Sequence, residues 1–231
     1  MNKKFTLIWA GILFLFPAFL YNSGLAAEET VTVQLREGLN YISFPLPAFK
    51  DAGSFFALLQ ADKKQMAYWS PNATWQPDRL QYQYYVGETG YNDFTSIEFV
   101  KGYWVYLVNL QTTSLTFKGS PPFLYILYLK KGWNAIGCPV TKETQIEKAL
   151  SPLIFGEDYS GVWRYSSSEA PYYQEYSANK KEFDTLMPGE GYWIKMLKDT
   201  TWKVTTDVTS PTGSIKINND KQYTNSGTVN L

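Results

Sequence analysis

The chain contains no histidine and a single cysteine, Cys138, among its 231 residues. The absence of histidine excludes Ser-His-Asp triads, histidine general bases and most zinc sites, because all of these use an imidazole. Cys138 has no second cysteine with which to form an intrachain disulfide, so a disulfide-stabilised scaffold is excluded as well. Basic and acidic residues balance at 21 each, and a chain without basic excess gives no indication of a nucleic-acid partner.

The N-terminus has the layout of a secretory signal peptide. Lys3 and Lys4 precede an uncharged apolar run at 5–20, and small residues follow it. A retained membrane anchor is the alternative, but Pro17 and the small-residue end favour cleavage. We therefore set residues 1–26 aside as a signal peptide and predict export to the extracellular space or cell surface, or to a periplasm. The mature chain is predicted to have no membrane span.

The rest of the chain is dominated by an internal duplication. The segment LREGLNYISFPL at 35–46 returns as LKKGWNAIGCPV at 129–140, and KGYWV at 101–105 returns as EGYWI at 190–194. A residue found at the same place in both copies is more often structural than catalytic. The duplication therefore indicates how the protein is built before it indicates what the protein does.

Two tandem repeat units follow from this duplication, one at 28–119 and one at 123–206. Runs rich in β-branched and aromatic residues alternate with glycine turns, which predicts about six short strands and one short helix in each unit. The first two strands of each unit flank Gly38 or Gly132 and are predicted to form a hairpin. The expected fold class is mainly β, with α+β repeat units.

One stretch of each copy differs in length. The copies align at an offset of 94 positions as far as Trp69 and Trp163, but at 89 positions in the Gly-Tyr-Trp motif. The five-residue difference must lie within 70–92 or 164–181. A length change in a repeat usually maps to a surface loop, so these variable stretches are candidates for function.

Residues 207–231 have a different composition from the repeat. They predict a linker followed by two short strands. Two strands alone do not make a stable sheet, so this segment is predicted to be the incomplete start of another module.

The repeated motifs resemble those of a known kind of surface protein. GLNYISFPL/GWNAIGCPV followed by KGYWVYL/GEGYWIKM is similar to the "GWNLIGLP … GxGYWV" repeat of exported bacterial and archaeal surface proteins, over roughly residues 30–206. Leu39 departs from the usual Trp, which the second copy keeps as Trp133. The end of the chain resembles the opening of bacterial immunoglobulin-like modules. The resemblance implies an exported, multi-module, non-catalytic protein and assigns no catalytic residue.

The residues that could carry catalysis have structural explanations. Cys138 corresponds to Phe44 in the first copy, which predicts a buried strand position for it. The acid pairs Asp93/Glu98 and Glu182/Asp184 are not kept in both copies. Only Asp93 and Glu182 correspond, and an acid at a fixed place beside a turn is most often a backbone hydrogen-bond acceptor.

The sequence has no recognisable motif for a cofactor or a metal. There is no phosphate-binding loop, and Asp207 with 218–220 lacks the ligand density of a calcium loop. We therefore predict that the chain is not an enzyme, with no cofactor and no metal site.

The aromatic residues, 17% of the chain, fall into two groups. Those repeated at matching positions are predicted to pack in the core or between strands: Trp69/Trp163, Tyr103/Tyr192 and Trp104/Trp193. Those in the variable stretches are candidate binding residues, because aromatic faces stack on the apolar faces of sugars and also suit protein contacts. They are Trp75, Tyr82, Tyr84, Tyr172, Tyr173 and Tyr176. The alternative is a tyrosine-rich hairpin that packs on the sheet.

The function expected from the sequence is adhesion or polysaccharide contact by an exported, non-catalytic module within a larger protein. The partner would be a polysaccharide or another surface protein. One alternative is a structural spacer in a cell-surface array. A second is an accessory part of a carbohydrate-active enzyme without its catalytic domain. Exposed aromatic residues in the variable stretches would favour binding, and buried ones would favour the spacer.

Overall fold

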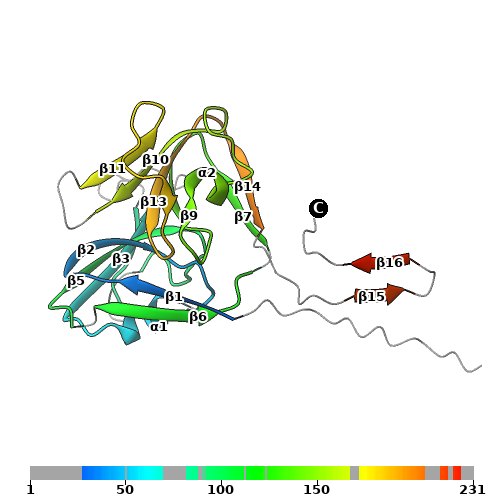
Figure 1. The fold of residues 1–231 in the computed structure, drawn as a ribbon. Helices are drawn as coiled ribbons and strands as arrows, with labels where there is room; N and C mark the ends of the chain where they lie inside the picture. The colour runs from blue at the N-terminus through cyan, green and yellow to red at the C-terminus, as the bar shows by residue number, and fades with distance from the viewer. Residues whose placement is uncertain are drawn as a thin grey trace, which may run out of the picture.

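In the computed structural model the chain is mainly β, as predicted, and its sheets are antiparallel (Figure 1). The structure describes residues 28–49, 51–69, 82–87, 90, 92–111, 113–122, 124–166, 172–205, 214–217 and 221–224. The predicted signal peptide lies outside these residues. No helix in this part of the chain is long and apolar enough to span a membrane.

The first unit has a four-stranded sheet, a two-stranded ribbon and a helix. Its elements are β1 (Glu29–Gln34), β2 (Gly38–Ser43), α1 (Ala52–Leu58), β3 (Lys63–Trp69), β4 (Tyr82–Tyr85), β5 (Gly102–Val108) and β6 (Ser114–Gly119). The sheet has the strand order β2-β5-β3-β4, and β1 pairs with β6 to form the ribbon.

The second unit repeats this plan. Its elements are β7 (Leu124–Leu129), β8 (Gly132–Gly137), β9 (Thr144–Gln145), α2 (Ile146–Ala149), β10 (Tyr159–Tyr165), β11 (Tyr173–Ser177), β12 (Thr185–Leu186), β13 (Gly191–Met196) and β14 (Thr200–Thr205). The sheet order β8-β13-β10-β11 matches that of the first unit, and β7 pairs with β14 as the ribbon. The short pair β9-β12 is an addition to the predicted plan. Beyond the second unit, β15 (Ser214–Ile217) pairs with β16 (Lys221–Thr224).

The predicted hairpin at the start of each unit is wrong. The strand β1 pairs with β6 and β2 pairs with β5, so the glycine turn between β1 and β2 joins two different sheets. The cause is Asn40, whose Oδ1 accepts the Arg36 N–H at 2.9 Å and whose Nδ2 donates to the Arg36 carbonyl at 2.8 Å. These are backbone groups at the turn that a hairpin would pair across the strands. Asn134 does the same with Lys130 in the second copy, which explains why Gly-x-Asn is repeated.

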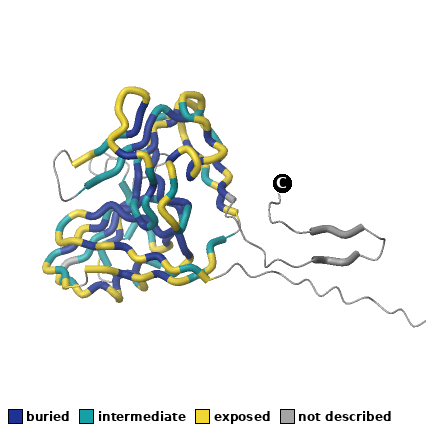
Figure 2. Tube along the Cα trace, viewed as in Figure 1, coloured by how far each residue is buried: buried dark blue, intermediate teal, exposed yellow. Residues whose placement is uncertain are grey.

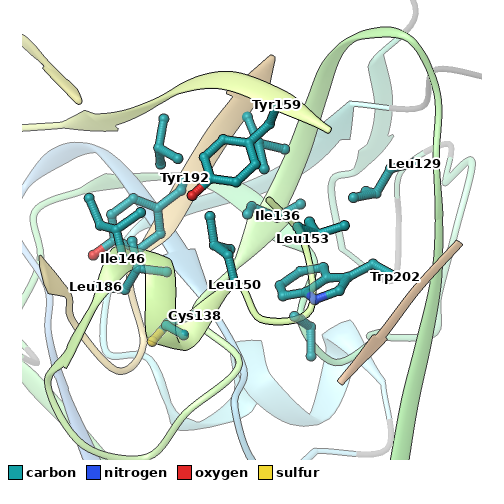
Figure 3. Packing of buried hydrophobic residues seen from close by; sticks show 14 of the residues in the cluster. Leu129, Ile136, Cys138, Ile146, Leu150, Leu153, Tyr159, Leu186, Tyr192 and Trp202 are labelled. Carbon is teal, nitrogen blue, oxygen red and sulfur yellow. The ribbon is translucent and has the colours of Figure 1, made fainter. Parts of the chain in front are cut away.

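Each unit has its own apolar core between its sheet, ribbon and helix (Figure 2). In the first unit, Phe44 meets Phe55 of α1 edge-on, with ring centroids 5.1 Å apart, and the ring of Phe117 of β6 is 5.6 Å from that of Phe44. In the second unit, Trp202 of β14 lies beside Leu153, and Ile136 is buried with them (Figure 3). The ribbon therefore closes the core in both units.

The two units meet through a reciprocal contact. Ser43 N–H donates to the Gly189 carbonyl at 2.8 Å, and the corresponding Gly137 N–H donates to the Val100 carbonyl at 2.7 Å. An exchange of equivalent bonds is the pattern of a two-fold symmetric interface, here formed within one chain. The approach is close, because a Cβ placed on Gly137 would lie 2.4 Å from the Ser43 Cβ. The duplication has therefore produced an internal dimer with a fixed arrangement of its two sheets.

Candidate functional site

The repeated tyrosine of each Gly-Tyr-Trp motif is buried in the core, as predicted. Tyr103 and Tyr192 are both fully buried. The Tyr103 hydroxyl accepts the Glu98 N–H at 2.8 Å, and the Tyr192 hydroxyl accepts the Met187 N–H at 2.7 Å. These two tyrosines have the same structural role in both copies, since each ties the turn before the strand to the core.

The tryptophan that follows each tyrosine lies on the opposite face of the sheet. Successive side chains of a strand point to opposite faces, so Trp104 and Trp193 point away from the cores. Both are half-buried and lie outside the core clusters, so of the two predicted roles they have packing between strands and not packing in the core. Tyr41 stacks on Trp104 at 4.3 Å and on Trp193 at 5.9 Å between ring centroids. A continuous aromatic layer therefore runs from one sheet to the other.

The outer face of the second sheet carries an open aromatic hollow. It encloses about 280 Å³ and is lined by Trp133, Trp163, Trp193 and Tyr173. Trp133 meets Trp163 edge-on at 4.5 Å and Trp193 at 6.5 Å. Trp133 is 43% exposed although it is a large apolar side chain. An open apolar cluster at a protein surface is a common feature of interaction sites.

The outer face of the first sheet continues this hollow. A space of about 400 Å³ is lined by Leu39, Gln65, Met66, Ala67, Tyr82, Tyr84, Trp104, Tyr106 and Tyr173. Tyr173 belongs to β11 of the second unit and lines both spaces. We name the two spaces together the aromatic groove. It runs across both units, on rigid strands whose spacing is set by the reciprocal junction.

Four of the six predicted binding residues lie at or beside the aromatic groove. Tyr82 and Tyr84 are on β4, and Tyr84 is 37% exposed. Tyr173 lines the groove and is 47% exposed. Tyr172 is 56% exposed and stacks on Tyr165, whose ring is 4.9 Å from that of Trp104. Trp75 lies outside the described residues.

Tyr176 was predicted to be a binding residue and is instead part of the core. It is 4% exposed, its ring meets that of Phe155, and its hydroxyl donates to Glu147 Oε1 at 2.7 Å. Tyr176 pairs with Val162 of β10, whose side chain faces the interior. Strand alternation thus places Tyr173 on the outer face and Tyr176 on the inner one.

The tryptophans Trp133, Trp163, Trp193 and Trp104 are the functional candidates that sequence reasoning missed. Three of them are repeated in both copies, and repetition predicts a structural role. The overlooked signal was the alternation in Tyr103-Trp104 and Tyr192-Trp193, because two adjacent strand residues cannot both face one core.

The candidates for catalysis have structural roles. Cys138 is fully buried, and burial raises the pKa of its thiol to about 12, so the nucleophilic thiolate is suppressed. Asp93 accepts the Tyr84 N–H at 3.0 Å and Glu182 accepts the Glu175 N–H at 2.8 Å, which confirms the predicted role of these two acids. Among the described residues, no group of three His, Cys, Asp or Glu side chains could hold a metal ion.

Comparisons with family models, with curated proteins and with solved structures find no match to this chain. The resemblance of its motifs to those of surface-protein repeats therefore stays a prediction.

Proposed function

We propose that this chain is an exported, non-catalytic module that binds polysaccharide in the aromatic groove. The observation that carries the proposal is the cluster of Trp133, Trp163, Trp193 and Tyr173 around an open hollow. Export is supported by the signal-peptide layout of residues 1–26.

Aromatic stacking is the chemistry that this groove offers. The C–H face of a pyranose ring is flat and apolar, and it packs against the face of an indole or phenol. The tryptophans stand on β8, β10 and β13, which are paired side by side, so their positions are fixed before a ligand arrives. Preorganised side chains lose little entropy on binding. Lys195, whose Nζ is 5.7 Å from the Trp133 ring centre, supplies a hydrogen-bond donor at the rim.

The composition of the groove lining supports binding without catalysis. Glycoside hydrolysis needs two carboxyl groups placed across the scissile bond. Among the described residues, those that line the groove include no carboxylate. A sugar chain bound to these residues would therefore meet stacking surfaces but no acid pair.

The structural spacer remains the second candidate. The reciprocal backbone bonds at the junction would also suit a stiff element in a surface array. A spacer, however, has no use for an open hollow lined by Trp133 and half-buried tryptophans, whereas a binding module requires one. If the chain is instead an accessory part of a carbohydrate-active enzyme, the groove would bind the same ligand, and catalysis would belong to a separate catalytic domain.

Affinity electrophoresis in gels that contain soluble polysaccharides tests the proposal. The gels would contain hydroxyethylcellulose, xylan, polygalacturonate or alginate, and the carboxyl-reduced forms of the last two. The wild type is expected to be retarded by at least one polymer. The double variant Trp133→Ala/Trp163→Ala is expected to bind that polymer at least about tenfold more weakly, because buried aromatic contacts dominate binding energy.

Tyr128→Ala is the matched control, because Tyr128 is 72% exposed on β7, away from the groove lining. Its retardation should equal that of the wild type. Equal retardation of the double variant and the wild type would contradict the groove as the binding site. If no polymer retards the wild type, the spacer is the better account.

A further inference from the structure

A polar hollow of about 440 Å³ lies where the two units meet. Arg36 and Tyr41 line it from the first unit, and Arg164, Tyr165, Gln174 and Glu190 line it from the second. We name this space the junction pocket. Its lining differs from that of the aromatic groove, because it combines two guanidinium groups with amide and carboxyl side chains.

The two arginines are available to an anion. Arg36 is exposed and Arg164 is half-buried, and neither forms a salt bridge with a described residue. Arg164 is nevertheless held in place: its Nε donates to Gln174 Oε1, and its guanidinium carbon is 4.9 Å from the centre of the Phe183 ring. A fixed guanidinium with free terminal N–H groups is suited to a carboxylate, which it can bind through two parallel hydrogen bonds.

Glu190 is the acid in the pocket lining, and it already has a partner. Its Oε2 accepts the Tyr192 hydroxyl at 2.8 Å. Burial raises the pKa of this carboxyl above its usual value, while the Tyr192 hydroxyl and the charge of Arg164 act in the opposite direction. Two guanidinium groups and one carboxyl line the pocket, so its described lining carries net positive charge even when Glu190 is ionised.

The junction pocket adjoins the aromatic groove. Tyr165 lines the pocket, and its ring is 4.9 Å from that of Trp104 and 5.6 Å from that of Tyr173, both of which line the groove. Tyr41 also lines the pocket and stacks on Trp104. An extended ligand could therefore occupy the groove and the pocket at once.

The side chains that line the pocket differ between the two copies. By the repeat offsets, Ala135 stands where the pocket has Tyr41, and Lys101 stands where it has Glu190. The reciprocal junction keeps its two backbone hydrogen bonds, although the residues that form them also differ. The backbone contact is therefore common to both copies, whereas the pocket lining belongs to one.

We propose that the junction pocket binds the carboxylate of a uronic acid residue in an acidic polysaccharide, while neighbouring sugars of that chain stack in the aromatic groove. This inference rests on the proposed function and specifies its substrate class. Arg36 and Arg164 would hold the carboxylate, and Gln174 would orient Arg164.

The test compares each acidic polymer with its own carboxyl-reduced form, polygalacturonate and alginate being the two pairs. The wild type is expected to bind one acidic polymer at least about tenfold more tightly than its reduced form, because a guanidinium–carboxylate pair is charge-assisted. Arg36→Gln should reduce that preference to about twofold or less. It should leave the affinity for the reduced polymer unchanged. Lys203→Gln, which removes one exposed charge from β14, should change neither value.

The outcomes separate this inference from the proposed function. If the wild type binds acidic and reduced polymers equally well, the junction pocket does not bind the carboxylate, but the aromatic groove can still be the polysaccharide site. If Lys203→Gln lowers the preference for the acidic polymer as much as Arg36→Gln does, the preference reflects net charge alone. That result would also contradict carboxylate binding in the junction pocket. Failure of every polymer to bind overturns both proposals. Arg164→Lys serves as a second variant, and it should weaken the preference because lysine cannot form the bidentate pair.

Discussion

The Trp202→Ala variant is expected to lose about 3–5 kcal/mol of unfolding free energy. Trp202 is fully buried in the core of the second unit, where it lies beside Leu153 (Figure 3). Its Nε1 donates to the Ser151 carbonyl at 3.3 Å. Truncation to alanine removes this hydrogen bond and leaves a large cavity under the ribbon. Chemical denaturation followed by circular dichroism would measure the loss.

The control for this variant lies on the same ribbon. Tyr128→Ala removes an aromatic ring that is 72% exposed, so the free energy of unfolding should change by no more than about 0.5 kcal/mol. If Trp202→Ala cost no more than this control, the β7-β14 ribbon would not be part of the folded core, and the description of the unit would be wrong.

The Gly189→Ala variant is expected to lose about 3 kcal/mol of unfolding free energy. Gly189 has a φ of +83°, a conformation that non-glycine residues adopt at a cost. A Cβ at this position would also lie 2.2 Å from Val33 Cγ2. Since the Gly189 carbonyl accepts the Ser43 N–H, relief of this clash would disturb the junction between the units.

The Gly156→Ala variant separates the cost of the positive φ from the cost of the clash with Val33. Gly156 has the same φ of +83°, but a Cβ there would meet no atom within 4 Å. This variant should cost only the conformational term, about 1–2 kcal/mol. Thermal denaturation of both variants side by side would reveal the difference. Equal losses would mean that Val33 does not pack closely against Gly189 and would contradict this prediction.

Val100 is the counterpart of Gly189 in the first copy, and it shows how the cost of a positive φ can be offset. Val100 has a φ of +57°, which is rare for a β-branched residue. Its side chain is fully buried, and it belongs to the core cluster of the second unit rather than to that of its own. The apolar burial of Val100 therefore compensates for its backbone, and it links the two units through side-chain packing.

The repeat predicted the fold class and the doubling of the architecture, because matching positions must have matching structural roles. It did not predict strand pairing. Gly38 followed by Asn40 has the local pattern of a hairpin turn. Only the side-chain bonds of Asn40 to Arg36 show that the chain passes from one sheet to another. Pairing between β1 and β6, which are far apart in sequence, leaves no local pattern to read.

The candidate site was only partly predictable, for two physical reasons. Tyr82, Tyr84 and Tyr173 could be found from the variable stretches, whereas Trp163 and Trp193 were hidden by their repetition. A repeated residue can serve the exposed face of a sheet as well as its core. The junction pocket could not be anticipated, since Arg36 and Arg164 come together only through the packing of one unit on the other.

The tryptophan indole N–H signals in a ¹⁵N-correlated NMR spectrum test the central claim most directly. Oligosaccharides of the polymer that gives the strongest retardation would be added stepwise to the protein. The account predicts that the signals of Trp133, Trp163 and Trp193 shift together and saturate with one affinity. The signal of Trp202, which is buried in the core, should not move. A saturating ligand that leaves all three groove signals in place would contradict the account.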